Sequence, residues 1–182
     1  MLNQKPLEKF KTKSGKEVEI YLPTTERVTA LLVFVNRLTE EDTFLNFTGR
    51  PKTILEETHW IKTALDSIEK KRGFYIWATY QGKIIASAGV ARGGPRDDHV
   101  GTLSLMVDRD FRSDGIGKRL LGFILNQAKA MAIKIVILDL FGTNTIAIEL
   151  YRKLGFQEYA RLPKGFYRKG KYADAIKMYK EL

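Results

Sequence analysis

Over its most informative segment, the chain reads Met106-Val107-Asp108-Arg109-Asp110-Phe111-Arg112-Ser113-Asp114-Gly115-Ile116-Gly117-Lys118. A strand pattern ends in this segment, a loop follows, and a helical pattern begins at the two glycines. The N-terminus of a helix has N–H groups without partners and a partial positive charge, so it can hold a phosphate. Glycine allows close approach of the backbone, and Arg112 and Lys118 add positive charge. The segment therefore predicts a phosphate-binding turn.

Two other glycine-rich phosphate motifs do not fit this segment. A Walker A loop requires glycine where the chain has Arg112, and serine or threonine where it has Arg119. A Rossmann fingerprint requires a third glycine where the chain has Leu120. The first helix of a dinucleotide-binding fold also follows an early strand, whereas this helix follows the fourth predicted strand.

Apolar spacing outward from the turn predicts the element order β, α, α, β, β, β, α, β, α, β, β. Thr53 and Glu56 form a capping box that opens the second helix, and Gly73 is its predicted stop. The predicted ranges are 18–22, 25–39, 54–68, 74–80, 83–91, 100–107, 115–132, 133–140, 144–154, 156–162 and 172–179. This order predicts an α/β fold with a mixed sheet and helices on both of its faces. Residues 1–16 are charged and poor in apolar residues, so we expect a flexible lead-in.

The composition is that of an ordinary soluble protein, and residues 1–182 have the length of one domain. No apolar run approaches the roughly 20 residues of a membrane span. The sequence has no cysteine, which excludes disulfides and thiolate catalysis. No signal peptide is expected, so the cytoplasm is the expected location. The net charge of +10 favours an anionic partner, either a phosphorylated cofactor or a nucleic acid, without separating the two.

Three segments together resemble the GCN5-related N-acetyltransferase (GNAT) family. Arg112, Gly115 and Gly117 match its R-x-x-G-x-G pyrophosphate motif. The segment 144–156 looks like its N-x-x-A-x-x-x-Y-x-x-x-G-F pattern, and the tail from Gly170 resembles the G-K-Y-x-D…M ending of one branch.

The resemblance covers residues 18 to 180. It implies the acyl-CoA N-acyltransferase fold, in which the mixed sheet is mostly antiparallel. It also implies an enzyme that moves an acetyl group from acetyl-CoA to a primary amine by direct attack in a ternary complex. A homodimer is compatible with the resemblance, since dimers are common in the family.

The resemblance further assigns residues to the cofactor. The end of the fourth predicted strand would pair its backbone with the pantetheine arm, and a backbone N–H at or near Val107 would stabilise the oxyanion. Asn144 would bind the same arm, although a helix N-cap is an equally good interpretation. The implied cofactor-binding set is Leu105, Met106, Val107, Arg112, Ser113, Asp114, Gly115, Ile116, Gly117, Lys118, Asn144, Ala147 and Tyr151. No metal ligand is assigned.

One part of the turn departs from the family pattern. Ser113 and Asp114 stand where the family often has a glycine and a basic residue. A carboxylate beside a diphosphate is unfavourable unless it points away or pairs with a cation. The expected cation partners of Asp114 are Arg109, Arg112 and Lys118.

Tyr151 is the predicted general acid, because a phenol with a pKa of about 10 can donate a proton to a departing thiolate. Its alternative is a tyrosine that only packs its helix onto the sheet. For the general base, His99 is a candidate because an imidazole has a suitable intrinsic pKa. Glu56, Glu57 and His59 lie on the second predicted helix, where the resemblance implies acceptor-site residues, although we prefer to interpret them as a solvated helix face.

Two alternatives to the enzyme stay open. One is an anion-binding or nucleic-acid-binding module, supported by a basic and aromatic cluster near the C-terminus. We interpret that cluster as an exposed hairpin with solvated charge, so nucleic acid is not an expected partner. The other alternative is a CoA-binding protein without catalysis. The sequence does not identify the amine acceptor. The cluster consists of Arg161, Lys164, Phe166, Tyr167, Arg168, Lys169, Lys171 and Tyr172.

Overall fold

The computed structural model describes residues 5–41, 44 and 50–182. The chain folds as two compact units. The first unit lies within residues 1–91 and 104–127, and the second is made of residues 92–103 and 128–182. Strand β5 (Val100–Val107) contributes its first residues to the second unit and its last residues to the first.

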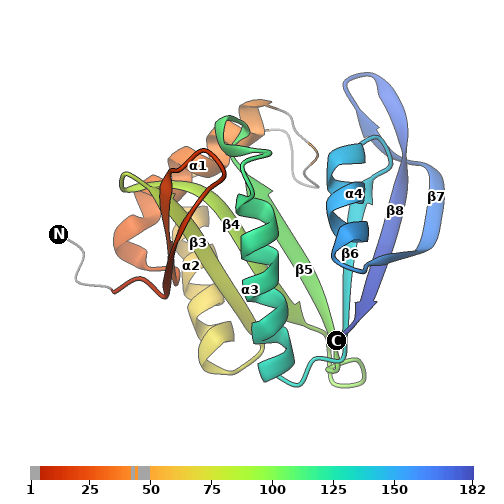
Figure 1. Ribbon diagram of the computed structural model, residues 1–182, viewed down its shortest axis with the longest axis horizontal. Helices are drawn as coiled ribbons and strands as arrows, with labels where there is room; N and C mark the ends of the chain where they lie inside the picture. The colour runs from red at the N-terminus through yellow and green to blue at the C-terminus, as the bar shows by residue number, and fades with distance from the viewer. Residues whose placement is uncertain (1–4, 42–43, 45–49) are drawn as a thin grey trace. The chain divides into compact units, whose positions relative to one another are not determined.

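Antiparallel strands form the sheet of the first unit (Figure 1). The pairs β1–β2, β2–β3 and β3–β4 are all antiparallel. In sheet order these strands are β1 (Glu8–Lys11), β2 (Glu17–Tyr21), β3 (Gly73–Tyr80) and β4 (Lys83–Arg92), with β5 next. Gln81 and Gly82, which join β3 to β4, both have positive φ, as a tight two-residue hairpin turn requires.

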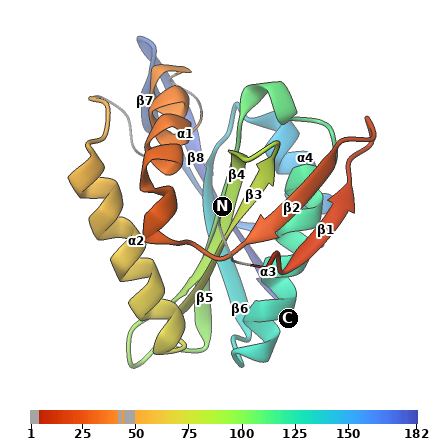
Figure 2. The same cartoon turned by 90° about the vertical axis from the view of Figure 1, so that its left-hand side faces the viewer.

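Helices α1 (Val28–Glu41) and α2 (Ile54–Glu69) cover one face of this sheet, and α3 (Ile116–Ala130) covers the other (Figure 2). Side chains alternate between the faces of a strand, so β3 supplies contacts to both layers. The ring of Trp77 stacks on Trp60 of α2 with centroids 6.5 Å apart, and Phe74 lies 6.3 Å from Phe123 of α3. The short 3-10 turns η1 (Thr25–Arg27) and η2 (Arg109–Phe111) lead into α1 and toward α3.

The core of the first unit lies between α1, α2 and the sheet. Its centre is the fully buried Trp77, and Trp60 and Met106 pack at its edge. Burial of each large apolar side chain contributes about 1.5–3 kcal/mol to folding, so this cluster holds the helices to the sheet. The buried members are Leu31, Phe34, Val35, Leu38, Ile61, Trp77 and Ile84.

The second unit combines a parallel and an antiparallel arrangement. The first residues of β5 pair in parallel with β6, while β6–β8 and β7–β8 are antiparallel. The ring of Phe141 stacks on Phe166, with centroids 4.2 Å apart. The later elements of this unit are β6 (Ile135–Phe141), α4 (Thr145–Lys153), β7 (Gln157–Arg168) and β8 (Lys171–Glu181), and its strands have the sheet order β5, β6, β8, β7.

This architecture confirms the predicted mixed, mostly antiparallel sheet with helices on both faces. Residues 1–16 were expected to form a flexible lead-in, but Glu8–Lys11 form β1 instead. The sequence did not predict this strand because its apolar content is low and its stability comes from pairing with β2.

Two boundaries also differ from the predictions. Gly73 does not stop α2. The helix ends at Glu69, Lys71 takes the positive φ of 54°, and Gly73 opens β3. A Cβ at Gly73 would lie 2.8 Å from Ser67 Oγ, so glycine is needed there for close approach. The last hairpin is longer than predicted, because the strands continue to a turn at Lys169 and Gly170, both with positive φ.

No helix in the described part of the chain is long and apolar enough to cross a membrane.

Candidate active site

The turn between β5 and α3 presents a row of backbone N–H groups. Ser113 and Gly115 have positive φ values of 62° and 89°, which bend the backbone before α3 begins at Ile116. Among the described residues, the N–H groups from Ser113 to Lys118 donate to no backbone acceptor; the first bond after the turn runs from the Arg119 N–H to the Gly115 oxygen, at 3.1 Å. These N–H groups lie at the positive end of a 15-residue helix. The arrangement fits an anionic oxygen ligand.

Buried hydrogen bonds fix the start of this turn. Asp108 is 4% exposed, and its N–H donates to the Ile85 oxygen at 2.9 Å. Its carboxylate accepts from the Asp110 N–H at 3.0 Å and pairs with Arg37 Nη1 at 3.0 Å. Arg37 also pairs with Asp110. The turn is therefore attached to α1 and β4 by groups that the sequence motif does not include.

Arg112 is held in place by other parts of the same unit. Its Nη1 and Nη2 atoms lie 2.5 Å and 2.8 Å from the two carboxylate oxygens of Glu41, at the end of α1. Its Nε donates to the Val107 oxygen at 3.0 Å. The guanidinium thus ties α1 to the end of β5, and a bound diphosphate would compete with Glu41 for it. The pyrophosphate role of Arg112 stays a prediction.

Asp114 finds a partner that the sequence did not indicate. Its carboxylate accepts hydrogen bonds from the Ser14 N–H at 2.7 Å and the Ser14 hydroxyl at 2.6 Å. Lys16 Nζ lies 3.5 Å away. The Ser14 hydroxyl, more than any other group, lowers the pKa of Asp114 from its usual value to about 2. The expected partners Arg109, Arg112 and Lys118 are not used, because the β1–β2 hairpin takes the carboxylate.

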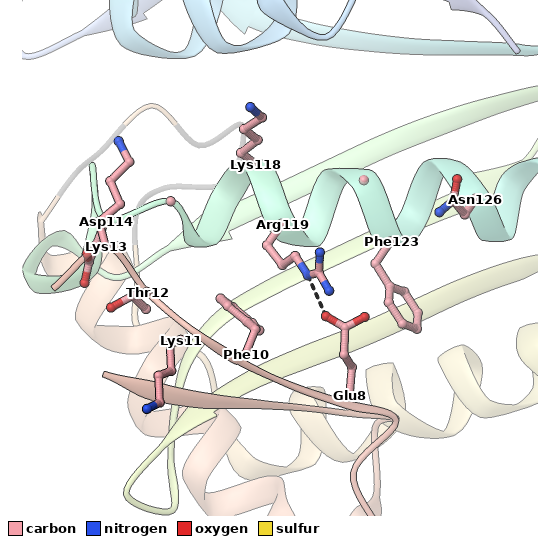
Figure 3. A pocket seen from close by; sticks show the side chains of 12 residues that line it. Glu8, Phe10, Lys11, Thr12, Lys13, Asp114, Lys118, Arg119, Phe123 and Asn126 are labelled. Carbon is pink, nitrogen blue, oxygen red and sulfur yellow. Dashed lines mark hydrogen bonds and ion pairs between the residues drawn. The ribbon is translucent and has the colours of Figure 1, made fainter. Parts of the chain in front are cut away.

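A cavity of about 640 Å³ lies between this hairpin and α3 (Figure 3). Arg119 and Phe123 point toward the hairpin, where Arg119 Nε lies 2.6 Å from Glu8 Oε1, whereas Lys118 points away from it. Asp114, Gly115 and Lys118 of the predicted phosphate turn line one end of the cavity.

The end of β5 carries the residues assigned to the pantetheine arm. Leu105, Met106 and Val107 are all half-buried. The register of β5 with β6 extends only from Val100 to Thr102, so the last residues of the strand lie beyond it. A strand end of this kind can add an extended ligand through main-chain hydrogen bonds.

The other predicted site residues belong to the second unit. Asn144 caps α4, because its Oδ1 accepts from the Ala147 N–H at 3.2 Å. Tyr151 is 7% exposed, and its ring packs edge-on against Phe156 with centroids 5.4 Å apart. Burial raises the pKa of the Tyr151 phenol above its ordinary value. The N-cap interpretation of Asn144 is confirmed, and the roles of all three residues toward a cofactor stay predictions.

The candidate bases His99 and Glu57 differ in their exposure to solvent. His99 is exposed and precedes β5 at the end of the strand opposite to Val107. At about 3.3 Å per residue, the strand separates the two by roughly 25 Å. Glu57, in contrast, is only 7% exposed, so the predicted solvated face is wrong for this residue. Its spacing from Ile61 and Ala64 places it on the buried stripe of α2, a signal the sequence contained.

The basic and aromatic cluster lies on β7 and β8. Its charges are partly neutralised, since Arg161 pairs with Glu158 at 2.8 Å and with Asp174 at 3.0 Å. The rings of Tyr167 and Tyr172 lie 5.2 Å apart across the hairpin. Among the described residues, no group of His, Asp and Glu side chains could hold a metal ion.

The family model of the acetyltransferase (GNAT) family matches residues 35–156 of this chain. N-alpha-acetyltransferase RimI of Mycobacterium tuberculosis is 34% identical over 97 residues, which are 52% of this chain and 58% of that protein. The chain spans between 33% and 58% of the length of the curated relatives that it matches.

Solved structures share the fold. The GNAT-family acetyltransferase from Streptococcus pneumoniae has a TM-score of 0.82 and 24% identity, covering 91% of this chain and 99% of that one. A phosphinothricin acetyltransferase from Sinorhizobium meliloti, solved in complex with AcCoA, has a TM-score of 0.80 and 17% identity, covering 91% and 88%.

Proposed function

Because this chain belongs to the GNAT acetyltransferase family, we propose that it moves the acetyl group of acetyl-CoA to a primary amine by direct attack in a ternary complex. We take residues 1–182 as one acetyltransferase domain, since the family model matches residues of both units. The phosphinothricin acetyltransferase that binds AcCoA and the RimI relative support the choice of acetyl-CoA and of an amine.

The observation that carries this proposal is the row of N–H groups from Ser113 to Lys118 at the start of α3. They fit the diphosphate of CoA, because each N–H can donate to a phosphate oxygen without losing a backbone bond. Asp114 does not oppose such a ligand, since its carboxylate is bonded to Ser14. Acetyl-CoA would supply a thioester, whose carbonyl is open to attack by an amine.

The chain's own residues would then do three things. The backbone from Leu105 to Val107 binds and orients the pantetheine arm, and an N–H at or near Val107 stabilises the negative charge on the reacting carbonyl oxygen. Tyr151 donates a proton to the leaving sulfur. Asn144 and Ala147 add contacts to the same arm.

Titration calorimetry of the purified chain with CoA and with acetyl-CoA tests the binding step. We expect one site for each ligand, with an affinity that falls as the salt concentration rises, because charged groups take part. CoA release across a panel of primary amines tests the transfer step. Absence of binding to either ligand would sink the proposal, and binding without CoA release for any amine would leave a CoA-binding protein that is not an enzyme.

A further inference from the structure

A second cavity lies in the first unit, between α1, α2 and the strands β4 and β5. Its volume is about 440 Å³. Its wall combines apolar and aromatic side chains with polar ones, and most of the polar ones lie on α2 or just before it. The lining residues are Leu31, Val35, Lys52, Glu56, Glu57, His59, Trp60, Thr63, Ser87 and Met106.

Glu57 is the unusual member of this wall. It is 7% exposed and stands on the face of α2 that also buries Ile61 and Ala64. Its backbone N–H bonds within the helix to Thr53, at 3.1 Å. No described residue donates a hydrogen bond to its carboxylate or forms an ion pair with it. Burial raises the pKa of this carboxyl group, with Lys52 opposing the shift. Because this carboxyl group lines the cavity and receives no hydrogen bond from a described residue, it is available to a cationic ligand.

The preceding residue provides an internal comparison. Glu56 faces Arg50, whose Nη1 and Nη2 lie 2.9 Å and 2.7 Å from its oxygens. It also accepts hydrogen bonds from the N–H and hydroxyl of Thr53, each at 2.9 Å. Arg50 is the main cause that lowers the pKa of Glu56 to about 2. The two neighbouring carboxylates therefore differ in both partners and pKa. Of the two, only Glu57 has no ion-pair partner and can bind a cationic ligand.

The surroundings of Glu57 define what that ligand can be. Trp60 is fixed by stacking on Trp77 and by an edge contact with Tyr75 at 5.8 Å, so one aromatic wall is rigid. Met106 also lines the cavity, and it belongs to the strand end assigned to the pantetheine arm. The cavity thus offers one carboxylate without an ion-pair partner, several apolar side chains, and a lining residue from the strand end assigned to the pantetheine arm.

On the basis of the proposed acetyl transfer, we propose that Glu57 binds the ammonium group of the acceptor in this cavity and takes its proton, and that the acceptor is a small primary amine with an apolar or aromatic body. One unpartnered carboxylate matches one ammonium group, and Trp60 and Met106 match the apolar part. Glu56 is already paired with Arg50, so a second cationic group on the acceptor would meet Lys52 or the apolar wall, and polyamines fit poorly.

The proton and electron movements balance. The ammonium nitrogen gives one proton to the Glu57 carboxylate, and the freed nitrogen lone pair forms the bond to the acetyl carbonyl carbon. The carbon–sulfur bond breaks and its electron pair stays on sulfur, which is protonated. The nitrogen loses its second proton, which replaces through solvent the proton that Tyr151 gave to sulfur, and Glu57 releases its own proton to solvent. The net products are an acetamide, CoA and one proton.

The pH dependence of acetyl transfer tests whether Glu57 is the base. The other charged or titratable groups facing the cavity are Lys52, Glu56 and His59, while α1, β4 and β5 contribute only groups that do not titrate. At subsaturating amine, the rate of acetyl transfer should rise with pH as Glu57 ionises. Because burial raises the pKa of Glu57, this rise should occur at a higher pH than is usual for a glutamate. The variant Glu57→Gln keeps the size and shape of the side chain but cannot ionise, so the rise of the rate with pH should disappear.

The test uses the full chain with phenylethylamine as the acceptor. We expect Glu57→Gln to lower kcat/KM for the amine by about a hundredfold or more, as for loss of a general base, with the Kd for CoA changed less than about twofold. Glu69→Gln, on the exposed part of the same helix, is the matched control and should retain both values. Spermidine should react at least about tenfold less well than phenylethylamine.

Amine binding measured by calorimetry in the presence of CoA separates this inference from the proposed function. Phenylethylamine should bind the unaltered chain and bind Glu57→Gln at least about tenfold more weakly. Such Glu57-dependent binding without acetyl transfer to phenylethylamine or to any amine of the panel would support the ammonium site and overturn the proposed enzyme. Equal kcat/KM and equal amine binding in Glu57→Gln and the unaltered chain would overturn the inference, even where CoA binds and acetyl transfer proceeds.

Discussion

Ser14 holds the carboxylate of Asp114 with two hydrogen bonds, although the two residues are 100 positions apart. The contact joins the β1–β2 hairpin to the predicted phosphate turn. The hydrogen bonds from Ser14 stabilise the negative charge of Asp114. The turn can therefore contain an acidic residue and still bind an anionic ligand such as a diphosphate.

This contact predicts a specific loss of stability in acid. The folded pKa of Asp114 is about 2, below its usual value of 3.8, so the contribution is present above pH 4 and is lost as the pH falls from 4 to 2. Asp114→Asn should therefore be less stable than the unaltered chain at neutral pH and should differ little from it near pH 2. Thermal unfolding followed by circular dichroism across this range measures the effect. Asp98→Asn, on an exposed loop, is the control and should track the unaltered chain.

Gly115 has a φ of 89°, which an alanine adopts only with strain. Gly115→Ala should lower the free energy of unfolding by about 1 kcal/mol and weaken CoA binding by about tenfold, because the N–H groups around it would shift. Gly122 lies in α3, with no atom within 4 Å of an added Cβ. Gly122→Ala should therefore be stabilising by about 0.5–1 kcal/mol. Equal effects of the two changes on CoA affinity would argue against the turn as the diphosphate site.

Arg112 is shared between Glu41 and the proposed diphosphate. Glu41→Gln should strengthen CoA binding severalfold, because it removes the anion that competes for the guanidinium. The stability change should stay below about 1 kcal/mol, as for other exposed ion pairs. Arg112→Gln should instead weaken CoA binding. Calorimetry at two salt concentrations distinguishes the variants, and weaker binding in Glu41→Gln would assign Arg112 a purely structural role.

Tyr151→Phe should reduce acetyl transfer by about a hundredfold and leave the Kd for CoA within about twofold. The ring keeps its contact with Phe156, so the fold should persist. Since burial raises the pKa of Tyr151, the phenol should stay protonated throughout the assay range and give no alkaline loss of activity of its own. Unchanged single-turnover rates in the variant would leave Tyr151 as a packing residue.

The capping box at the start of α2 makes a prediction about stability alone. Thr53 Oγ1 accepts from the Glu56 N–H at 3.3 Å, and the Glu56 side chain accepts from the Thr53 N–H at 2.9 Å. Thr53→Ala should lower the free energy of unfolding by about 1 kcal/mol, measured by denaturant titration. Thr63→Ala, in the middle of the same helix, should have a much smaller effect. If Thr53→Ala and Thr63→Ala lowered the free energy of unfolding equally, the capping box would contribute nothing to stability.

Local sequence by itself determined most of the elements and the turn. The capping box of α2, the glycines of the turn and the aromatic and β-branched composition of β3 are interactions or preferences within a few residues, so they can be read without the fold. The family resemblance came from the same kind of signal, and the match over residues 35–156 confirms it.

Only the tertiary structure decided which charged groups are free to act. Helical spacing already places Glu57 on the buried stripe of α2, but only the packing of α2 decides that its carboxylate receives no hydrogen bond while that of Glu56, one position earlier, pairs with Arg50. The partners of Asp114 and Arg112 come from β1–β2 and α1, which lie far away in sequence. Burial and charge pairing depend on distances between segments that local preferences do not set, and the pKa values that chemistry uses follow from those distances.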